Sequence, residues 1–368
     1  MIPNQIMQST IDGLKQITHK QITVLDREGK IVASTNMGTP HELEPIVKSF
    51  ILSPADNQSA KGLQYFKVLD NGIVSYVVIV EGEDDETYRV GKITAFHVQS
   101  LILAYKERLD KDNFIKNLLL DNMLQIDISS RAKRLNIEYN VRRVVYYIET
   151  PLNSDTSTVE VLRGMFPDNH KDFVTAIDEN SVILVKELSP KDNYNQVLYT
   201  ANIIFDTLTS EIMSMTYISI GAVANDLKNV SSSLKEAKLA REVGKIFEPD
   251  KRIVSYERLG IGRLIYQLPP ALCKIFIKEM LQDFSLGDID SDMYHTVVKF
   301  FQNDLNVSET ARELFIHRNT LVYRLDKLEQ LTHLDLRNFS DAITFKITLM
   351  VNKYMQYVES LERRKTND

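Results

Sequence analysis

The stretch from residue 305 to 331, LNVSETARELFIHRNTLVYRLDKLEQL, constrains the fold more than any other part of the 368-residue chain. Its apolar residues recur at helical spacing on both sides of a short break, which predicts a helix, a tight turn and a second helix. Ser308 can cap the first helix, and the small Ala311 would let the second helix cross closely. We expect Phe315 and Ile316 to fill the turn.

The second helix of this pair leaves polar side chains of types that contact nucleic acids. We expect it to begin at about Arg318 to Asn319 and to bury Leu321, Leu325 and Leu328 at helical steps. The side chains left for its other faces are Arg318, Asn319, Thr320, Tyr323, Arg324 and Lys327. Residues 312 to 327 hold four basic and two acidic side chains, so this segment carries a net charge of +2 within a chain of net charge -6.

These residue types at the start of a second helix suit double-stranded DNA. In helix-turn-helix proteins the second helix lies in the major groove, because this groove displays a distinct pattern of donors and acceptors for each base pair. The sequence therefore predicts two sets of contacts: bases by Arg318, Asn319, Thr320 and Arg324, and phosphates by Tyr323 and Lys327. The alternative is a solvated helix pair in a structural bundle.

The first 110 residues predict a small antiparallel sheet with helices around it. Residues 21 to 34 form two β-branched runs around Asp26-Arg27-Glu28-Gly29, which predicts a hairpin. Residues 63 to 69 and 73 to 80 form a second hairpin through Asp70-Asn71-Gly72. The acidic run that follows ends the sheet as a solvated loop.

A long helix is predicted for residues 87 to 120, where apolar side chains recur at three- and four-residue spacing without proline. Such a helix can carry a dimer seam out of a sensor domain. The alternative is a pair of shorter helices with a break near residues 110 to 113.

Strands and helices alternate in the middle of the chain, which predicts an α/β or α+β domain. Strands are expected at residues 142–148 and 217–224, with a hairpin over 172–187 that turns at Asp178-Glu179-Asn180. Helices are expected at 195–210 and at 231–243, the latter with a serine cap. From Leu264 onward the apolar spacing is helical, which predicts an all-helical remainder.

Residues 306 to 325, NVSETARELFIHRNTLVYRL, resemble the C-terminal helix-turn-helix of the sugar-diacid and purine-catabolism regulators, a family of bacterial transcription factors. The run His317-Arg318-Asn319-Thr320-Leu321 is highly specific to that family. Residues 218–221, 233–244 and 253–264 resemble the family's middle domain, which is related in fold to nucleotide cyclases. The resemblance implies a ligand-responsive DNA-binding transcriptional regulator.

The N-terminal part resembles a diverged sugar-diacid recognition domain, whose fold is PAS-like, through residues 22–34, His41-Glu42 and residues 79–89. The family's Arg-Ile-Gly motif is replaced by residues 36–40, and its Gly-Ile-Asn-Leu-Pro-Ile segment is GLQYFK at residues 62–67. We therefore predict a small-molecule effector without naming it. The polar residues available in these two loops are Asn36, Thr39, His41, Gln64 and Tyr65.

We accordingly predict a multidomain α+β protein with three parts. A PAS-like antiparallel-sheet sensor covers residues 1–110 and exits through the 87–120 helix, a degenerate α/β cyclase-like domain covers 111–262, and an all-α domain covers 263–368, with its helix-turn-helix at 306–330. We also expect a homodimer or higher homo-oligomer, because one recognition helix buries too little surface for strong specific binding.

Catalysis is not predicted for the middle domain. The hairpin of a cyclase carries Gly-Gly-Asp/Glu-Glu-Phe, whereas the corresponding turn here, residues 177–181, is IDENS. Gly260-Ile261-Gly262 has no third glycine and predicts a turn before a helix rather than a dinucleotide loop. We expect no cofactor and no enzyme activity. The alternative is a nucleotide-binding or cyclase-like signalling protein whose C-terminal helices only dimerise.

Other classes of site lack support in the sequence. The seven histidines show no ligand-pair spacing, so no metal site is predicted. The single cysteine, Cys273, lies among apolar residues and is expected in a core. One cysteine cannot form an internal disulfide, which favours a cytoplasmic protein. No apolar run approaches the roughly 20 residues of a membrane-spanning helix, and the N-terminus does not read as a signal peptide.

Overall fold

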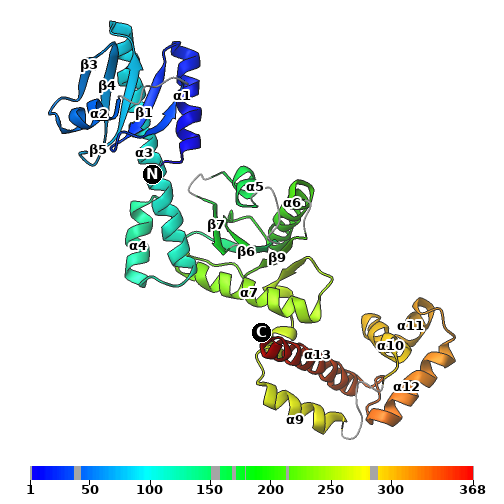
Figure 1. Cartoon of the computed structure of the whole chain (residues 1–368). Helices are drawn as coiled ribbons and strands as arrows, with labels where there is room; N and C mark the ends of the chain where they lie inside the picture. Colours follow the sequence, from blue (N-terminus) through cyan, green and yellow to red (C-terminus); the bar gives the residue numbers. More distant parts are fainter. Residues whose placement is uncertain are drawn as a thin grey trace. The chain divides into compact units, whose positions relative to one another are not determined.

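The computed structural model describes residues 2–36, 43–150, 158–167, 171–178, 180–212, 215–281 and 289–367. It divides into two compact units, residues 1–114 and 115–368 (Figure 1). No helix in the described ranges is both long and apolar enough to cross a membrane.

The first unit contains a five-stranded antiparallel sheet in the order β2-β1-β5-β4-β3. Both predicted hairpins are present, with Gly29 and the Asn71-Gly72 pair at positive φ in their turns. The strands are β1 (Ile22–Asp26), β2 (Ile31–Ser34), β3 (Asn57–Ala60), β4 (Leu63–Asp70) and β5 (Ile73–Glu81).

Helices cover both faces of this sheet, and each face has its own core. Helices α1 (Asn4–Thr18) and α3 (Asp85–Leu119) pack on one face, which contains Val24, Phe66 and Val78. Helix α2 (Leu43–Leu52) packs on the other face, against Leu25, Tyr65 and Val77. Successive side chains along a strand point to opposite faces of the sheet, so they enter the two cores alternately.

Helix α3 runs for 35 residues without the break that the sequence allowed near residue 110. Its start is fixed by Asp84, whose Oδ1 accepts hydrogen bonds from the Thr87 N–H at 2.6 Å and the Thr87 hydroxyl at 2.8 Å. These bonds and the ammonium of Lys20 lower the pKa of Asp84 to about 2. The long predicted helix is therefore confirmed, and its last residues belong to the second unit.

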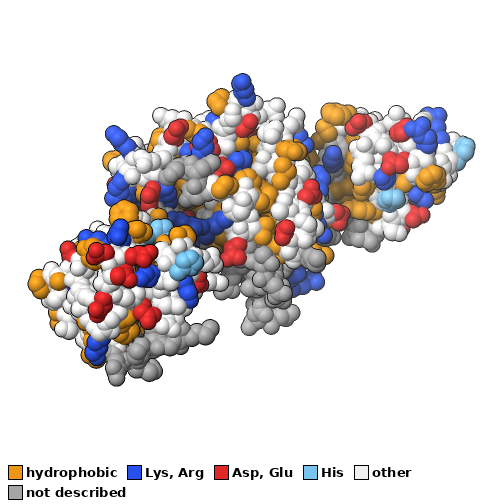
Figure 2. Space-filling view, turned by 90° about the horizontal axis from the view of Figure 1, so that it is seen from above, with side chains coloured by type: hydrophobic (Ala, Val, Ile, Leu, Met, Phe, Trp, Pro, Cys, Tyr) orange, Lys and Arg blue, Asp and Glu red, His pale blue; other side chains and the backbone are white. Residues whose placement is uncertain are grey.

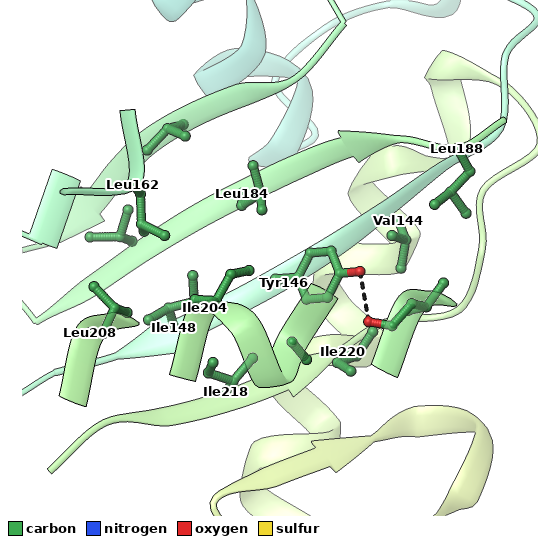
Figure 3. Packing of buried hydrophobic residues seen from close by; sticks show 14 of the residues in the cluster. Val144, Tyr146, Ile148, Leu162, Leu184, Leu188, Ile204, Leu208, Ile218 and Ile220 are labelled. Atoms are coloured by element: carbon green, nitrogen blue, oxygen red, sulfur yellow. Dashed lines mark hydrogen bonds between the residues drawn. The ribbon is translucent and has the colours of Figure 1, made fainter. Parts of the chain in front are cut away.

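The second unit contains another five-stranded sheet, in the order β10-β9-β6-β8-β7, in which only the β9–β10 pair is parallel. Helices α5 and α6 cover one face, where Tyr146 donates from its hydroxyl to the Val197 carbonyl at 3.0 Å (Figure 3). The elements are α4 (Gln125–Arg134), β6 (Arg143–Glu149), α5 (Thr158–Met165), β7 (Phe173–Asp178), β8 (Ser181–Glu187), α6 (Tyr194–Ile212), β9 (Tyr217–Ile220), α7 (Val230–Phe247) and β10 (Ile253–Ser255), with 3-10 turns at Leu227–Asn229 and Tyr256–Arg258.

The start of α7 differs from the predicted serine cap. Asp226 accepts from the Asn229 N–H and begins a 3-10 turn that leads into the helix at Val230. Ser231 and Ser233 are buried in the first turns, and the Ser233 hydroxyl donates to the Ala222 carbonyl at 2.7 Å. The prediction of a serine cap was wrong because the 3-10 turn that Asp226 begins precedes the helix, and the Ser233 hydroxyl bonds to the Ala222 carbonyl instead of closing the helix end.

The described residues of the second unit after β10 form helices joined by turns and loops and contain no strand, as predicted. Cys273 is buried, which confirms its place in a core, and burial raises the pKa of its thiol. The helices are α8 (Gly262–Ile265), α9 (Pro270–Leu281), α10 (Ser291–Gln302), α11 (Val307–Glu313), α12 (Arg318–Thr332) and α13 (Phe339–Asn367).

The approach of α7 to the sheet yields a stability prediction. A Cβ at Gly221 would lie 2.0 Å from the Ser233 carbonyl oxygen. This oxygen belongs to the backbone, so it cannot shift as the end of a flexible side chain could. Gly221→Ala should therefore destabilise the protein by roughly 1 to 3 kcal/mol. Gly164→Ala, in α5 and with nothing within 4 Å of the added Cβ, is the matched control and should be neutral or stabilising. Thermal unfolding of both variants checks this; equal midpoints would contradict the close packing.

Candidate nucleic-acid interface

Helices α11 and α12 form the predicted helix-turn-helix. The cap of α11 is Asn306, whose side-chain oxygen accepts from the N–H groups of Ser308 at 3.0 Å and Glu309 at 3.1 Å. The predicted cap, Ser308, instead lies inside the first turn. The cap of α12 is His317, whose Nδ1 accepts from the Asn319 N–H at 3.3 Å. Sequence reasoning missed this role of His317 because histidine is not among the preferred capping residues.

The buried side of α12 is the predicted leucine row. Leu321, Leu325 and Leu328 lie in one core with Ala311 of α11 and Phe300 of α10. The small side chain of Ala311 is almost fully buried, which fits its predicted role at the helix crossing. This packing fixes the rotation of α12 about its own axis.

Five of the six predicted DNA-contacting side chains lie exposed on α12: Arg318, Asn319, Thr320, Tyr323 and Lys327. Thr320, Tyr323 and Lys327 line one side of a shallow groove, whose other side is the first turn of α10 with Asp290 and Asp292. The structure therefore brings the start of α12 and its next two turns onto one accessible surface.

Arg324 is placed differently from our prediction that it reads a base. Its side chain is 24% exposed, and its guanidinium donates to the Thr296 hydroxyl at 2.8 Å and to Asp292 Oδ2 at 3.1 Å. These contacts hold α12 against α10. The reason is that position 324 adjoins the buried leucine row, so its side chain reaches the neighbouring helix.

The charges around α12 leave two cations without an acidic partner. In the described part of the chain, Arg318 and Lys327 make no ion pair, whereas Asp326 is paired with Arg337 at 2.7 Å. Arg337 also contacts Glu329 and Asp335. The carboxylates that would repel a phosphate are therefore partly neutralised. Figure 2 shows Lys, Arg and His side chains interspersed with Asp and Glu side chains on the lobe that holds these helices.

The turn between the two helices was only half predicted. Ile316 packs against the core of the lobe, but Phe315 is 96% exposed and does not fill the turn. The backbone of Phe315 has a φ of 54°, which turns its side chain outward.

The predicted effector residues do not all meet on one surface. Gln64 and Tyr65 are neighbours in β4, so their side chains point to opposite faces of the sheet. The Gln64 amide donates to the Asp84 carbonyl at 3.3 Å on the α3 side, whereas Tyr65 lies in the α2 core. Asn36 follows β2. Thr39 and His41 lie outside the described residues.

Two buried side-chain atoms of the first unit, Gln64 Oε1 and the Tyr65 hydroxyl, have no hydrogen-bond partner among the described residues, and the hydroxyl is the one that can donate. Tyr65 is completely buried. Burial raises the pKa of this phenol, so it stays protonated and can donate.

The sequence also raised three other classes of site: a cyclase hairpin, a dinucleotide loop and a metal centre. Strands β7 and β8 pair as the predicted antiparallel hairpin, and the Asp178 carboxylate accepts from the Asn180 N–H at 3.0 Å. Gly260 has a φ of 53° and precedes α8, which confirms a turn before a helix. Within the described ranges no three His, Cys, Asp or Glu side chains gather as metal ligands would.

Two family models match the chain. Residues 293–351 match the PucR C-terminal helix-turn-helix domain, and residues 121–243 match a GGDEF-like domain. The first range contains α11, α12 and all six predicted contact residues. The second contains β6 to β9 and most of α7. The matches therefore contain the helix-turn-helix and four of the five strands of the second sheet.

Curated relatives extend over more of the chain. The carbohydrate diacid regulator of Escherichia coli (strain K12) is 23% identical over 383 aligned positions, which cover 96% of this chain and 98% of that protein. The proline-responsive transcriptional activator PutR of Bacillus subtilis (strain 168) is 25% identical over 71% of this chain and 67% of its own length.

Two further comparisons are more limited. The purine catabolism regulatory protein of Bacillus subtilis (strain 168) is 27% identical over 36% of this chain and 25% of that protein. A solved regulator of polyketide synthase expression from Bifidobacterium adolescentis aligns over 68% of this chain and 98% of its own, with 17% identity and a TM-score of 0.33. The helix-turn-helix match and the regulators among the curated relatives support a DNA-binding transcriptional regulator that is similar to the sugar-diacid and purine-catabolism regulators.

Proposed function

We propose that this regulator reads its operator with the first turns of α12. A small polar metabolite bound by the N-terminal unit controls this binding, and the middle domain does not catalyse a reaction. The observation that supports operator reading is the exposed set Arg318, Asn319 and Thr320 at the start of a helix whose other side is buried. The N-terminus of a recognition helix is the part that reaches base edges. The proposed domains are residues 1–110, 111–262 and 263–368.

Arg318 and Arg324 should separate base reading from positioning. Arg318→Ala should lose about 1 to 3 kcal/mol of binding free energy on the operator and little on random DNA, because its guanidinium has no partner within the described protein. Arg324→Ala should weaken binding to both DNAs by a similar factor and lower the unfolding temperature, since it releases α12 from α10. Fluorescence anisotropy at several salt concentrations measures this.

Two results would contradict this assignment. Equal losses of Arg318→Ala on operator and random DNA would make Arg318 a phosphate contact. A folded protein whose DNA affinity does not fall with salt would exclude DNA binding by this surface, because phosphate contacts release counterions.

We propose that the working form is a homodimer with α3 at its seam. Ile93, Phe96 and Leu103 are exposed apolar residues on the face of α3 opposite its buried side, and they follow the spacing of a coiled-coil seam. Phe96 is 73% exposed and lies seven residues before Leu103. Burying these side chains in a second copy would remove an apolar stripe from water.

Phe96→Glu should convert the dimer into monomers, because it places charge in the seam. His97→Glu, an exposed neighbour that lies off the stripe, is the matched control and should remain dimeric. Light scattering at micromolar concentration measures both. A wild-type monomer, with and without DNA, would count against any dimer, and a dimeric Phe96→Glu protein would exclude this seam.

The effector is proposed to bind on the α2 face of the first sheet, where the buried Tyr65 hydroxyl has no hydrogen-bond partner among the described residues. Asn36 lies two residues after the end of β2, and Thr39 and His41 lie outside the described residues. Gln64 lies on the other face and is left out of this site. An effector can change operator affinity only by its differential affinity for two states of the protein, typically about 1 to 3 kcal/mol.

Tyr65→Phe should leave thermal stability unchanged or raised, because the hydroxyl it removes has no partner among the described residues. The same variant should weaken effector binding about tenfold, the equivalent of roughly 1.4 kcal/mol. Isothermal titration of the full chain with acidic sugars, hydroxy acids and purine breakdown products identifies the effector first. Gln64→Met is the control; a loss of affinity in Gln64→Met but not in Tyr65→Phe would place the site on the opposite face.

A further inference from the structure

The turn between α11 and α12 closes with a hydrogen-bond pattern that usually requires glycine. The Ile316 N–H donates to the Ala311 carbonyl at 3.0 Å, and the Phe315 N–H donates to the Arg312 carbonyl at 3.1 Å. This pair of bonds places one residue after the helix end in the left-handed region. That residue is Phe315, with a φ of 54°.

Within the described residues the ends of α3 and α4 close in the same way, and there the left-handed position is held by residues that tolerate it. Asp121 and Asn136 follow the ends of α3 and α4, with φ values of 61° and 55°. At these ends the Asn122 and Ile137 N–H groups bond back across the last turn, each at 2.9 Å. Asp and Asn enter the left-handed region at small cost, whereas a bulky aromatic residue is an outlier there.

Packing offers no compensation for Phe315. Leu305, another large apolar residue with positive φ, is partly buried against the core of the lobe. Phe315 is 96% exposed, so its ring lies almost entirely in water. The left-handed backbone disfavours a phenylalanine at this position, and no core packing stabilises its ring. Residues with strained backbones of this kind gather at functional sites.

The location of the ring indicates its use. Phe315 stands three residues before Arg318 and two before His317, the cap of α12, so it borders the surface proposed to enter the major groove. The apolar group that DNA displays in that groove is the methyl group of thymine. Contact with it would remove both the ring and the methyl from water.

We propose that Phe315 is a specificity-determining residue that packs its ring on a thymine methyl group at the edge of the operator half-site. This inference rests on the proposed operator reading by α12. Polar base contacts come from the helix, and the apolar contact comes from the turn before it.

The test compares Phe315→Gly with the wild-type full-length protein on duplexes that the wild type selects from a random library. Glycine relieves the left-handed backbone and removes the ring, so thermal stability should stay equal or rise. Operator affinity should fall about tenfold, while affinity for random DNA stays unchanged. Phe315→Leu, which keeps an apolar side chain, should fall between the two.

Replacing each operator thymine by deoxyuridine, which lacks the methyl group, assigns the contact. The wild type should lose affinity at one thymine near the half-site edge, and Phe315→Gly should be insensitive at that same position. Wild-type binding that ignores every replacement, or an equal loss by Phe315→Gly on random DNA, would overturn the thymine contact.

The remaining outcomes separate this inference from the function on which it rests. If Phe315→Gly binds the operator as tightly as wild type while Arg318→Ala does not, the ring contact is wrong and operator reading by α12 stands. If only transcription in vitro changes, the ring serves a protein partner and the inference fails. If the wild type binds no DNA, operator reading itself fails.

Discussion

The burial of the leucine row of α12 determines what the rest of this helix can do. With Leu321, Leu325 and Leu328 in the core, the rotation of α12 is fixed, and its first residues face outward. The contacts of Arg324 with Thr296 and Asp292 of α10 also fix the position of α12. A reader of base edges needs this rigidity, because hydrogen bonds to bases lose their selectivity when the donors are free to move.

In the first unit, the alternation of side chains along each strand separates neighbouring residues into two cores. Its sheet has two cores, and neighbouring residues of β4 belong to different ones. The face with α1 and α3 continues into the long helix, whereas the face with α2 holds the Tyr65 hydroxyl. Any effector on the α2 face acts on α3 through the sheet between them, and a sheet packed on both sides transmits small shifts because it has little free volume.

The middle domain keeps the architecture of a GGDEF-like domain with different residues in its hairpin. Its sheet is packed closely by α7, to the point that Gly221 has no room for a side chain. A core of this density is suited to hold the elements around it in fixed positions. The fold itself does not imply catalysis, because activity depends on the side chains placed at the site.

Periodicity and turn chemistry made much of this protein predictable from its sequence. Both hairpins of the first sheet, the long helix, the hairpin of the middle domain and the leucine row of α12 follow from local patterns. Such patterns are reliable because the backbone repeat of a helix or strand dictates which residues share a face. The exposure of Arg318, Asn319 and Thr320 follows from the same rule.

Only the tertiary structure decided the features that depend on a neighbour distant in the sequence. Arg324 became an anchor because α10 brings Asp292 and Thr296 within reach, and Ser233 became a buried donor because α7 lies on the sheet. Gln64 and Tyr65 were separated once both faces of their strand were covered. The outward ring of Phe315 depends on a backbone angle that the closure of α11 imposes. Sequence pattern determined which residues share a face, and packing determined what each face meets.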